Sequence, residues 1–325
     1  MRFAEIHKKR SQGFTLVEIM AATGIMLVII LLVLTLTTNV LSSWTRSSGQ
    51  LSTNFEARVA LDLLTSDLES VVIRNRPINW VQLDYQRVED IDDSPVLYFF
   101  APALERPRKK ENGDDILGDV CAISYRLDFD NPFIAGQQNA GNQPVPTYGL
   151  YRSVVDAENT FNHALSIANI KAPGSNTIRS NATLKAYWDG DAINSDGVGI
   201  AQEVIAENGR EANIRDWVLS SGNFLSQNVA DFQVVFWFRD QNGILRSVDP
   251  PERLIYADQL YLSDDGSNFR EQPGARLEYV DVSLTILSRE GASALNLDPS
   301  VNYDDAVQQY GEVFTRRINL MSSGF

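Results

Sequence analysis

Residues 8–41 read KKRSQGFTLVEIMAATGIMLVIILLVLTLTTNVL, and this stretch decides the fold class. A leader ends at Gly13, and an apolar run begins abruptly at Phe14. The leader carries three consecutive basic side chains, Lys8, Lys9 and Arg10. One acidic residue, Glu18, lies near the start of the apolar run. An ionised carboxylate in hydrocarbon is costly unless it is paired, so the position of Glu18 predicts that its side chain has a functional partner.

The apolar run is long enough to cross a membrane. From Ile19 to Val40 the chain carries no charge, and at 1.5 Å per residue this stretch spans about 33 Å, against roughly 30 Å for a bilayer core. A secretory signal peptide has a shorter apolar region followed by an Ala-x-Ala-like site. Because basic flanks stay cytoplasmic, the sequence predicts a single membrane span with a cytoplasmic N-terminus and the rest of the chain outside. A plain signal anchor has the same topology.

The junction at Gly13 resembles the processing site of the type IV prepilin family, which includes the pseudopilins of type II secretion. The matching residues are Gly13, Phe14, Thr15, Leu16, Val17 and Glu18. The resemblance implies that a prepilin peptidase removes leader 1–13 by cutting between Gly13 and Phe14, and that the new N-terminal Phe14 is methylated. It also implies that the Glu18 carboxylate meets the free amine of a neighbouring subunit during assembly. The resemblance further implies other pilins or pseudopilins as partners, in a filament or tip complex, together with an inner-membrane assembly platform. It also implies a single-pass inner-membrane protein whose globular domain is periplasmic or extracellular.

The helix is predicted to continue beyond the membrane run, from about residue 14 to about residue 74, because the first proline is Pro77. Residues 14–41 would form its transmembrane or filament-core part, and residues 42–76 an amphipathic continuation. Apolar residues of the continuation recur at spacings of three or four, at Leu51, Phe55, Val59, Leu63, Leu64, Leu68, Val71 and Val72. Three acidic residues lie between them, Asp62, Asp67 and Glu69. The apolar stripe is predicted to pack against a globular domain.

Beyond Pro77 the apolar period changes to two, which indicates β-strands. The expected strands lie near residues 96–100, 120–129, 148–154, 231–240, 276–287 and 313–320. The DQNG sequence at 240–243 predicts a hairpin turn. Alternation of apolar and polar residues favours antiparallel sheet with one face in water. The predicted fold class is therefore α+β: one long helix, then an antiparallel β-sheet globular domain at 77–325, which the resemblance makes pilin-like.

The same layout resembles the J-type minor pseudopilins of type II secretion and the related W-type minor pilins. The features that carry this resemblance are RVALDLLTSDLESV at 58–71, GLYRS at 149–153, RDQNG at 239–243 after a late strand, and a last strand before the C-terminus. Residues 155–230 depart from the pattern as an enlarged insertion. The resemblance implies a minor subunit of a type II secretion pseudopilus or a type IV pilus.

Composition excludes several function classes. The formal net charge of −14 gives a surface that repels phosphate backbones, so no nucleic-acid partner is expected. The histidines are His7, in the leader, and His163, so with a single cysteine the chain lacks the ligands of an ordinary structural zinc site. It also lacks a Gly-x-Ser-x-Gly motif to supply the nucleophile of a serine hydrolase. The chain is therefore not expected to be an enzyme. The single cysteine, Cys121, forms no internal disulfide and is expected to be buried in a strand.

Two acidic loops carry the oxygen ligands that calcium takes. The first, at 188–199, holds Asp189, Asp191, Asn194 and Asp196 without the spacing of an EF-hand, and the second is LSDDGSN at 262–268. Because Asp, Asn and Gly are also ordinary turn residues, both interpretations stay open: no cofactor, or calcium at one of the loops. The basic run at 106–110 and the acidic pair at 114–115 are expected in solvated loops.

These residues bear on three possible functions. The first is a prepilin-like subunit that is cleaved and assembles. The second is a signal-anchored periplasmic or surface binding protein that does not assemble, which leaves Gly13 and Glu18 without a role. The third, a secreted enzyme, lacks a catalytic constellation.

Overall fold

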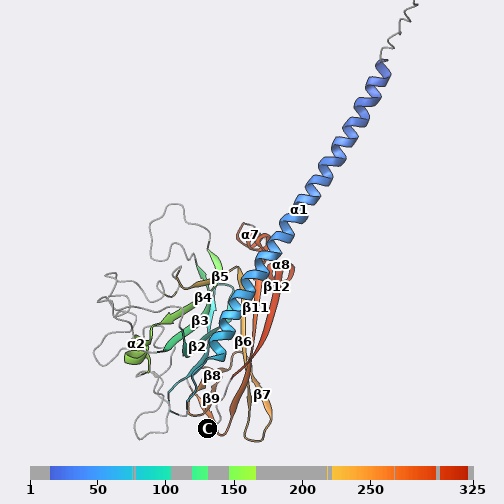
Figure 1. Ribbon diagram of the computed structural model, residues 1–325. Helices are drawn as coiled ribbons and strands as arrows, with labels where there is room; N and C mark the ends of the chain where they lie inside the picture. Colours follow the sequence, from blue (N-terminus) through green and yellow to red (C-terminus); the bar gives the residue numbers. More distant parts are fainter. Residues whose placement is uncertain are drawn as a thin grey trace, which may run out of the picture. The chain divides into compact units, whose positions relative to one another are not determined.

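The computed structural model describes residues 15–74, 76, 78–103, 119–130, 146–165, 218, 222–266, 268–297 and 301–320. The chain divides into two units, Met1–Leu51 and Ser52–Phe325. Helix α1 (Leu16–Glu69) belongs to both units, and the strands belong to the second (Figure 1). The predicted order of a long apolar helix followed by antiparallel sheet is confirmed.

Helix α1 ends at Glu69, several residues before the end predicted near residue 74. The β-branched residues Val71, Val72 and Ile73 follow directly. Their side chains favour extended backbone, and the Val72 N–H donates to the carbonyl of Phe100 at 2.8 Å. Pairing with a strand therefore replaces a further helical turn, and the helix stops without a proline.

The larger sheet has eight strands in the order β10-β9-β8-β1-β2-β3-β4-β5, with every neighbouring pair antiparallel. Its strands are β1 (Val81–Val88), β2 (Ile91–Pro102), β3 (Val120–Asp130), β4 (Thr147–Val155), β5 (Phe224–Gln227), β8 (Arg253–Tyr256), β9 (Leu260–Ser263) and β10 (Arg270–Gln272). The strands expected near 96–100, 120–129 and 148–154 are confirmed as its centre.

The smaller sheet has four antiparallel strands in the order β12-β11-β6-β7. These are β6 (Val229–Arg239), β7 (Leu245–Val248), β11 (Arg276–Leu287) and β12 (Gly311–Asn319). The hairpin predicted at 240–243 joins β6 to β7, with Gly243 at φ +78°, a conformation that favours glycine. One face of the smaller sheet is apolar and buried, as the alternation predicted. Its residues are Phe232, Val234, Phe236, Phe238, Val280, Val282, Leu284 and Ile286.

Short helical segments complete the described structure. They are α2 (Ala157–Asn159), the π-helical turn η1 (Thr160–Ala164), α7 (Arg289–Leu297) and α8 (Tyr303–Tyr310). The predicted insertion at 155–230 begins with α2 and η1 and ends in β5 and the start of β6, while residues 166–217 lie outside the described part of the chain.

One hydrophobic cluster joins the second half of α1 to both sheets. The prediction of one wet face is wrong for the larger sheet. In β3 the apolar positions such as Ile123 are buried, and so are the alternating polar positions Ser124, Arg126 and Asp128. The larger sheet is therefore covered on both sides at its centre, and one of its two buried faces carries polar side chains.

Candidate functional site

The processing motif enters the described structure at Thr15, since Gly13, Phe14 and the basic leader lie outside it. Thr15 precedes the first residue of α1, and its hydroxyl accepts from the Glu18 N–H at 3.3 Å. In return one oxygen of the Glu18 carboxylate accepts from the Thr15 N–H at 3.0 Å and from its hydroxyl at 3.1 Å. This reciprocal pair is a capping box. The Thr-x-x-Glu spacing was visible in the sequence, but its capping role was missed.

The apolar run follows Glu18 in the same helix. Its large side chains are exposed throughout, from Leu16 and Val17 to Val40 and Leu41. In the described part of the chain, α1 is the one helix long and apolar enough to cross a membrane. Exposed apolar surface of this extent is suited to lipid or to other helices rather than to water.

The second half of α1 packs on the sheets through a different face from the one predicted. The buried positions are Thr53, Ala57, Ala60, Leu61, Leu64, Asp67 and Leu68. Leu64 and Leu68 were predicted correctly, but Leu51, Phe55 and Val59 are exposed. The contact combines two alanines, Ala57 and Ala60, with three leucines, Leu61, Leu64 and Leu68. The periodicity was right and the orientation of the helix was wrong.

Asp67, which lies between the apolar positions of the helix, is the centre of a buried ion pair that the sequence analysis did not predict. Its two carboxylate oxygens accept from Arg152 of β4, at 2.7 Å from Nε and 3.0 Å from Nη2. The Tyr125 hydroxyl of β3 donates to the same carboxylate at 2.6 Å. The side chains of Arg152 and Asp67 are only 4% and 5% exposed. Burial, and next the Asp67 charge, raise the pKa of Tyr125 well above its ordinary value, so its hydroxyl remains a donor.

Weaker polar contacts tie the same helix segment to both sheets. Arg316 of β12 pairs with Asp62, and the Glu56 carboxylate accepts from Gln227 of β5 at 3.3 Å. The Asn54 amide donates to Glu312 at 3.5 Å. These groups lie at the solvent edge of the contact, so they orient the helix more than they stabilise it.

The opposite face of this segment is apolar and bare. Phe55 is 69% exposed and Val59 is 44% exposed, and Leu51, one turn earlier, is 72% exposed. At 100° per residue, Phe55 lies about 180° around the helix from the buried Leu64. The second half of α1 is thus apolar on two sides, one packed on the sheets and one open. Large apolar side chains on the exposed side of a helix, in addition to those on its packed side, are typical of a helix with partners on more than one side.

A second Asp–Arg pair lies on the outer face of the smaller sheet. Arg317 of β12 donates to both oxygens of Asp281 on β11, at 2.7 and 2.8 Å, and the Trp237 ring N–H donates at 3.0 Å. The Arg317 guanidinium also lies 4.0 Å from the centre of the Tyr279 ring. Hydrogen bonds from Arg317 lower the pKa of Asp281, against the opposing effect of partial burial.

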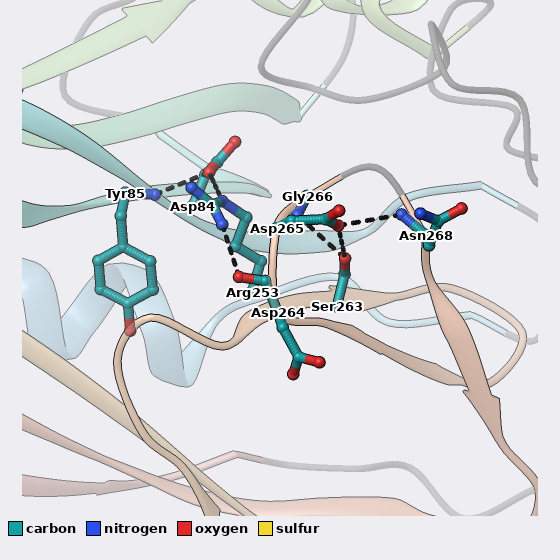
Figure 2. Close-up of polar contacts among 8 residues, drawn as sticks. All are labelled: Asp84, Tyr85, Arg253, Ser263, Asp264, Asp265, Gly266 and Asn268. Carbon is teal, nitrogen blue, oxygen red and sulfur yellow. Dashed lines mark hydrogen bonds and ion pairs between the residues drawn. The ribbon is translucent and has the colours of Figure 1, made fainter.

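Figure 2 shows the acidic loop at 262–268, one of the two calcium candidates. Asp265 accepts from the Ser263 hydroxyl at 3.0 Å and from the Asn268 N–H at 3.3 Å, and these are turn contacts. Asp264 pairs with Arg270 at 2.8 Å, and its carbonyl accepts from Arg253 at 3.1 Å. The carboxylates of Asp264 and Asp265 have different partners, so the geometry of this loop does not support a calcium site.

Other sequence candidates have simpler outcomes. Cys121 is buried in β3, as expected. His163 lies in η1, and its side chain is outside the described structure. The first calcium loop at 188–199 and the charged stretches at 106–110 and 114–115 also lie outside it. Among the described residues, no group of three or more His, Cys, Asp or Glu side chains is placed to hold a metal ion.

The chain is therefore an α+β protein with a bare apolar N-terminal helix. Its residues 8–34 match the family model for the prokaryotic N-terminal methylation motif. A solved structure, a type IV-like pilin from Thermus thermophilus, aligns with 82% of this chain and 94% of its own, at 10% identity and a TM-score of 0.27. A TM-score this low does not establish a common fold. No curated protein matches the chain.

Proposed function

We propose that the chain is a prepilin-like subunit that is cleaved and incorporated into a type II secretion pseudopilus or a type IV pilus. The methylation motif at 8–34 carries this proposal, because it implies processing by a prepilin peptidase. The parts of the chain would be a leader at 1–13, a transmembrane or filament-core helix at 14–41, its continuation from 42, and a periplasmic or extracellular domain to residue 325. The N-terminus would be cytoplasmic.

The bare face of α1 favours assembly over a plain membrane anchor. A signal anchor needs exposed apolar surface only where it crosses the bilayer, yet Phe55 and Val59 are also exposed in the stretch that packs on the sheets. Leaving large apolar side chains in water costs about 1.5–3 kcal/mol each relative to burial. Neighbouring subunits that cover this face would recover that energy.

The finer assignment is a minor subunit similar to the J-type pseudopilins or W-type minor pilins. Two of the sequence patterns behind that resemblance meet in the fold: Asp67 from 58–71 pairs with Arg152 from 149–153. The pair ties the helix end to the centre of the larger sheet, so both patterns serve one contact.

Processing is tested by expressing the full chain with and without an active prepilin peptidase and measuring the intact mass and the N-terminal peptide. The expected mature chain begins at N-methylated Phe14, and a Gly13→Leu variant remains uncut. A wild-type chain that still begins at Met1 beside an active peptidase would overturn the proposal in favour of a signal-anchored protein.

The role of Glu18 can be separated from helix capping. Glutamine also closes a capping box, so Glu18→Gln keeps the contact with Thr15 but removes the charge, whereas Glu18→Ala removes both. If the carboxylate neutralises a neighbour's amine, both variants insert into the membrane and both lose incorporation into filaments. Normal incorporation of Glu18→Gln would leave capping as the only role of this residue.

The bare face is tested with Phe55→Ala in the same incorporation assay. We expect normal cleavage and normal stability, with a several-fold smaller share of the subunit in the filament fraction. Phe161→Ala is the matched control, because Phe161 is 74% exposed and lies in η1 rather than on α1. Equal incorporation of both variants would remove the bare face from the assembly surface.

A further inference from the structure

The face of the larger sheet that points away from Asp67 carries a group of buried polar side chains. Tyr125 and Arg152 reach Asp67 on one face, so the alternating residues of β3 and β4 lie on the other. Five residues there have side-chain atoms without a hydrogen-bond partner among the described residues: Ser94, Ser124, Arg126, Tyr151 and Ser153. We call these five residues the polar cluster.

Strand register brings the polar cluster together. Arg126 on β3 lies opposite Tyr151 on β4, and Ser124 lies opposite Ser153. Residues directly opposite each other on one face have Cβ atoms about 5 Å apart. Ser94 lies on the same face of β2, two residues before Val96, the β2 partner of Arg126. Register therefore places Arg126 and four hydroxyl-bearing residues in one patch on this face.

Arg126 is the unusual member of the polar cluster. It is 6% exposed, and in the described part of the chain its Nε and Nη2 atoms have no hydrogen-bond partner. A guanidinium is always charged, and a buried charge without a partner is strongly destabilising. Two carboxylates lie on the same face but have other partners. Asp84, opposite Val96 on β1, pairs with Arg253 at 2.6 Å, and Asp128, two residues along β3, accepts the Phe129 N–H at 2.9 Å.

We propose that Arg126 and the surrounding hydroxyls form a binding site for a carboxylate. Nε and Nη2 lie on one edge of the guanidinium, and that edge donates two parallel hydrogen bonds to a carboxylate. Hydroxyls such as those of Ser124 and Tyr151 can donate to the remaining lone pairs. With a single positive charge in the cluster, and Asp128 nearby, a monoanion is favoured over a multiply charged phosphate. This site is independent of the function proposed above.

The test is the thermal unfolding of the full chain in detergent, with acetate, inorganic phosphate or no added anion at constant ionic strength. Acetate is expected to raise the unfolding temperature of the wild type by about 5–10 °C at a hundredfold excess over its Kd, and phosphate is not. Two peptides, N-acetyl-tetraalanine with a free and with an amidated C-terminus, distinguish the sources of the carboxylate. Stabilisation by the free peptide alone indicates a chain terminus, and stabilisation by acetate indicates a small molecule.

Variants decide whether Arg126 is responsible. Arg126→Met removes the charge at similar volume and is expected to abolish the acetate effect, while Tyr151→Phe and Ser124→Ala weaken it. Arg87→Met, at a side chain that is 75% exposed, is the matched control and keeps the effect.

Three results would overturn the carboxylate site. If neither acetate nor the peptide stabilises the wild type, Arg126 does not bind a carboxylate, and an Arg126→Met variant that then unfolds at a higher temperature would identify Arg126 as an unpaired buried charge. If acetate stabilises Arg126→Met as much as the wild type, it binds elsewhere. A larger effect of phosphate than of acetate would show that the ligand class is wrong.

Discussion

Two Asp–Arg pairs in this protein have the same hydrogen bonds and opposite surroundings. Asp67 and Asp281 each accept two hydrogen bonds from one guanidinium and a third from an aromatic side chain. The Asp67–Arg152 pair is about 5% exposed, with 4% for the arginine and 5% for the aspartate. In the Asp281–Arg317 pair, Arg317 is 55% exposed and Asp281 is 22% exposed.

The difference teaches what a charge pair does at each depth. A buried pair gains little net stability, because desolvation offsets the attraction, but it makes either partner indispensable to the other. An exposed pair is screened by water and salt, and each partner can be lost cheaply. The buried pair therefore fixes which face of α1 meets the larger sheet, whereas the exposed pair adds only modest stability between neighbouring strands.

The largest expected effect is the loss of one buried partner. Asp67→Ala leaves Arg152 charged and unpaired inside the protein, so we expect the free energy of unfolding to fall by about 3–5 kcal/mol. Asp281→Ala should cost at most about 1 kcal/mol. Urea unfolding of the full chain in detergent measures both.

A double variant separates pairing from packing. Replacing both partners, as Asp67→Leu with Arg152→Met, removes the charges together and should recover most of the stability lost in Asp67→Ala. Equal losses in Asp67→Ala and Asp281→Ala would contradict the contrast between the two pairs.

The third donor of each pair gives an intermediate effect. Tyr125→Phe removes a buried hydrogen bond to a charged group, which is worth about 1.5–3 kcal/mol. At Asp281 the loss of the Trp237 ring N–H, in Trp237→Phe, should cost less because water can replace it. The same urea experiment applies, repeated in 1 M NaCl. Salt should reduce the coupling at Asp281 and leave that at Asp67 unchanged, and a Tyr125→Phe loss that shrinks with salt would place the Asp67 pair in contact with solvent.

Sequence patterns predicted the parts of the fold in which periodicity determines the outcome. The apolar run, the hairpin at 240–243 and the inner face of the smaller sheet follow from alternation and turn chemistry that act over a few residues. The alternation in β3 was also read correctly, but its consequence was not. Whether Ser124 and Arg126 face water depends on what covers the sheet, which is a tertiary property.

The orientation of the second half of α1 could not be predicted for a similar reason. Two apolar faces compete in that segment, and the large side chains of Phe55 and Val59 suggested the wrong one. Ala57 and Ala60 lie at the contact instead, and which face of the helix is buried depends on how it fits the sheets rather than on the volume of its own side chains. An acidic residue at a helical spacing from Leu64, with an arginine in a central strand, was the available signal for the Asp67–Arg152 pair.

The smallest expected effect is the pH dependence of the exposed pair. Hydrogen bonds from Arg317 lower the pKa of Asp281 in the folded protein, so its stabilising contribution is complete above the unfolded-state pKa, about 3.9, and is lost as pH falls through the folded value. The wild type should therefore exceed Asp281→Asn by about 0.5–1 kcal/mol at pH 7 and lose this advantage in acid. Asp231→Asn is the matched control, for which the pH dependence should have the opposite sign. Because burial raises the pKa of Asp231, the wild type should lose stability relative to this variant as pH rises. If both differences changed with pH in the same direction, the two carboxylates would share one environment, and the distinction between buried and exposed charge would not hold for this sheet.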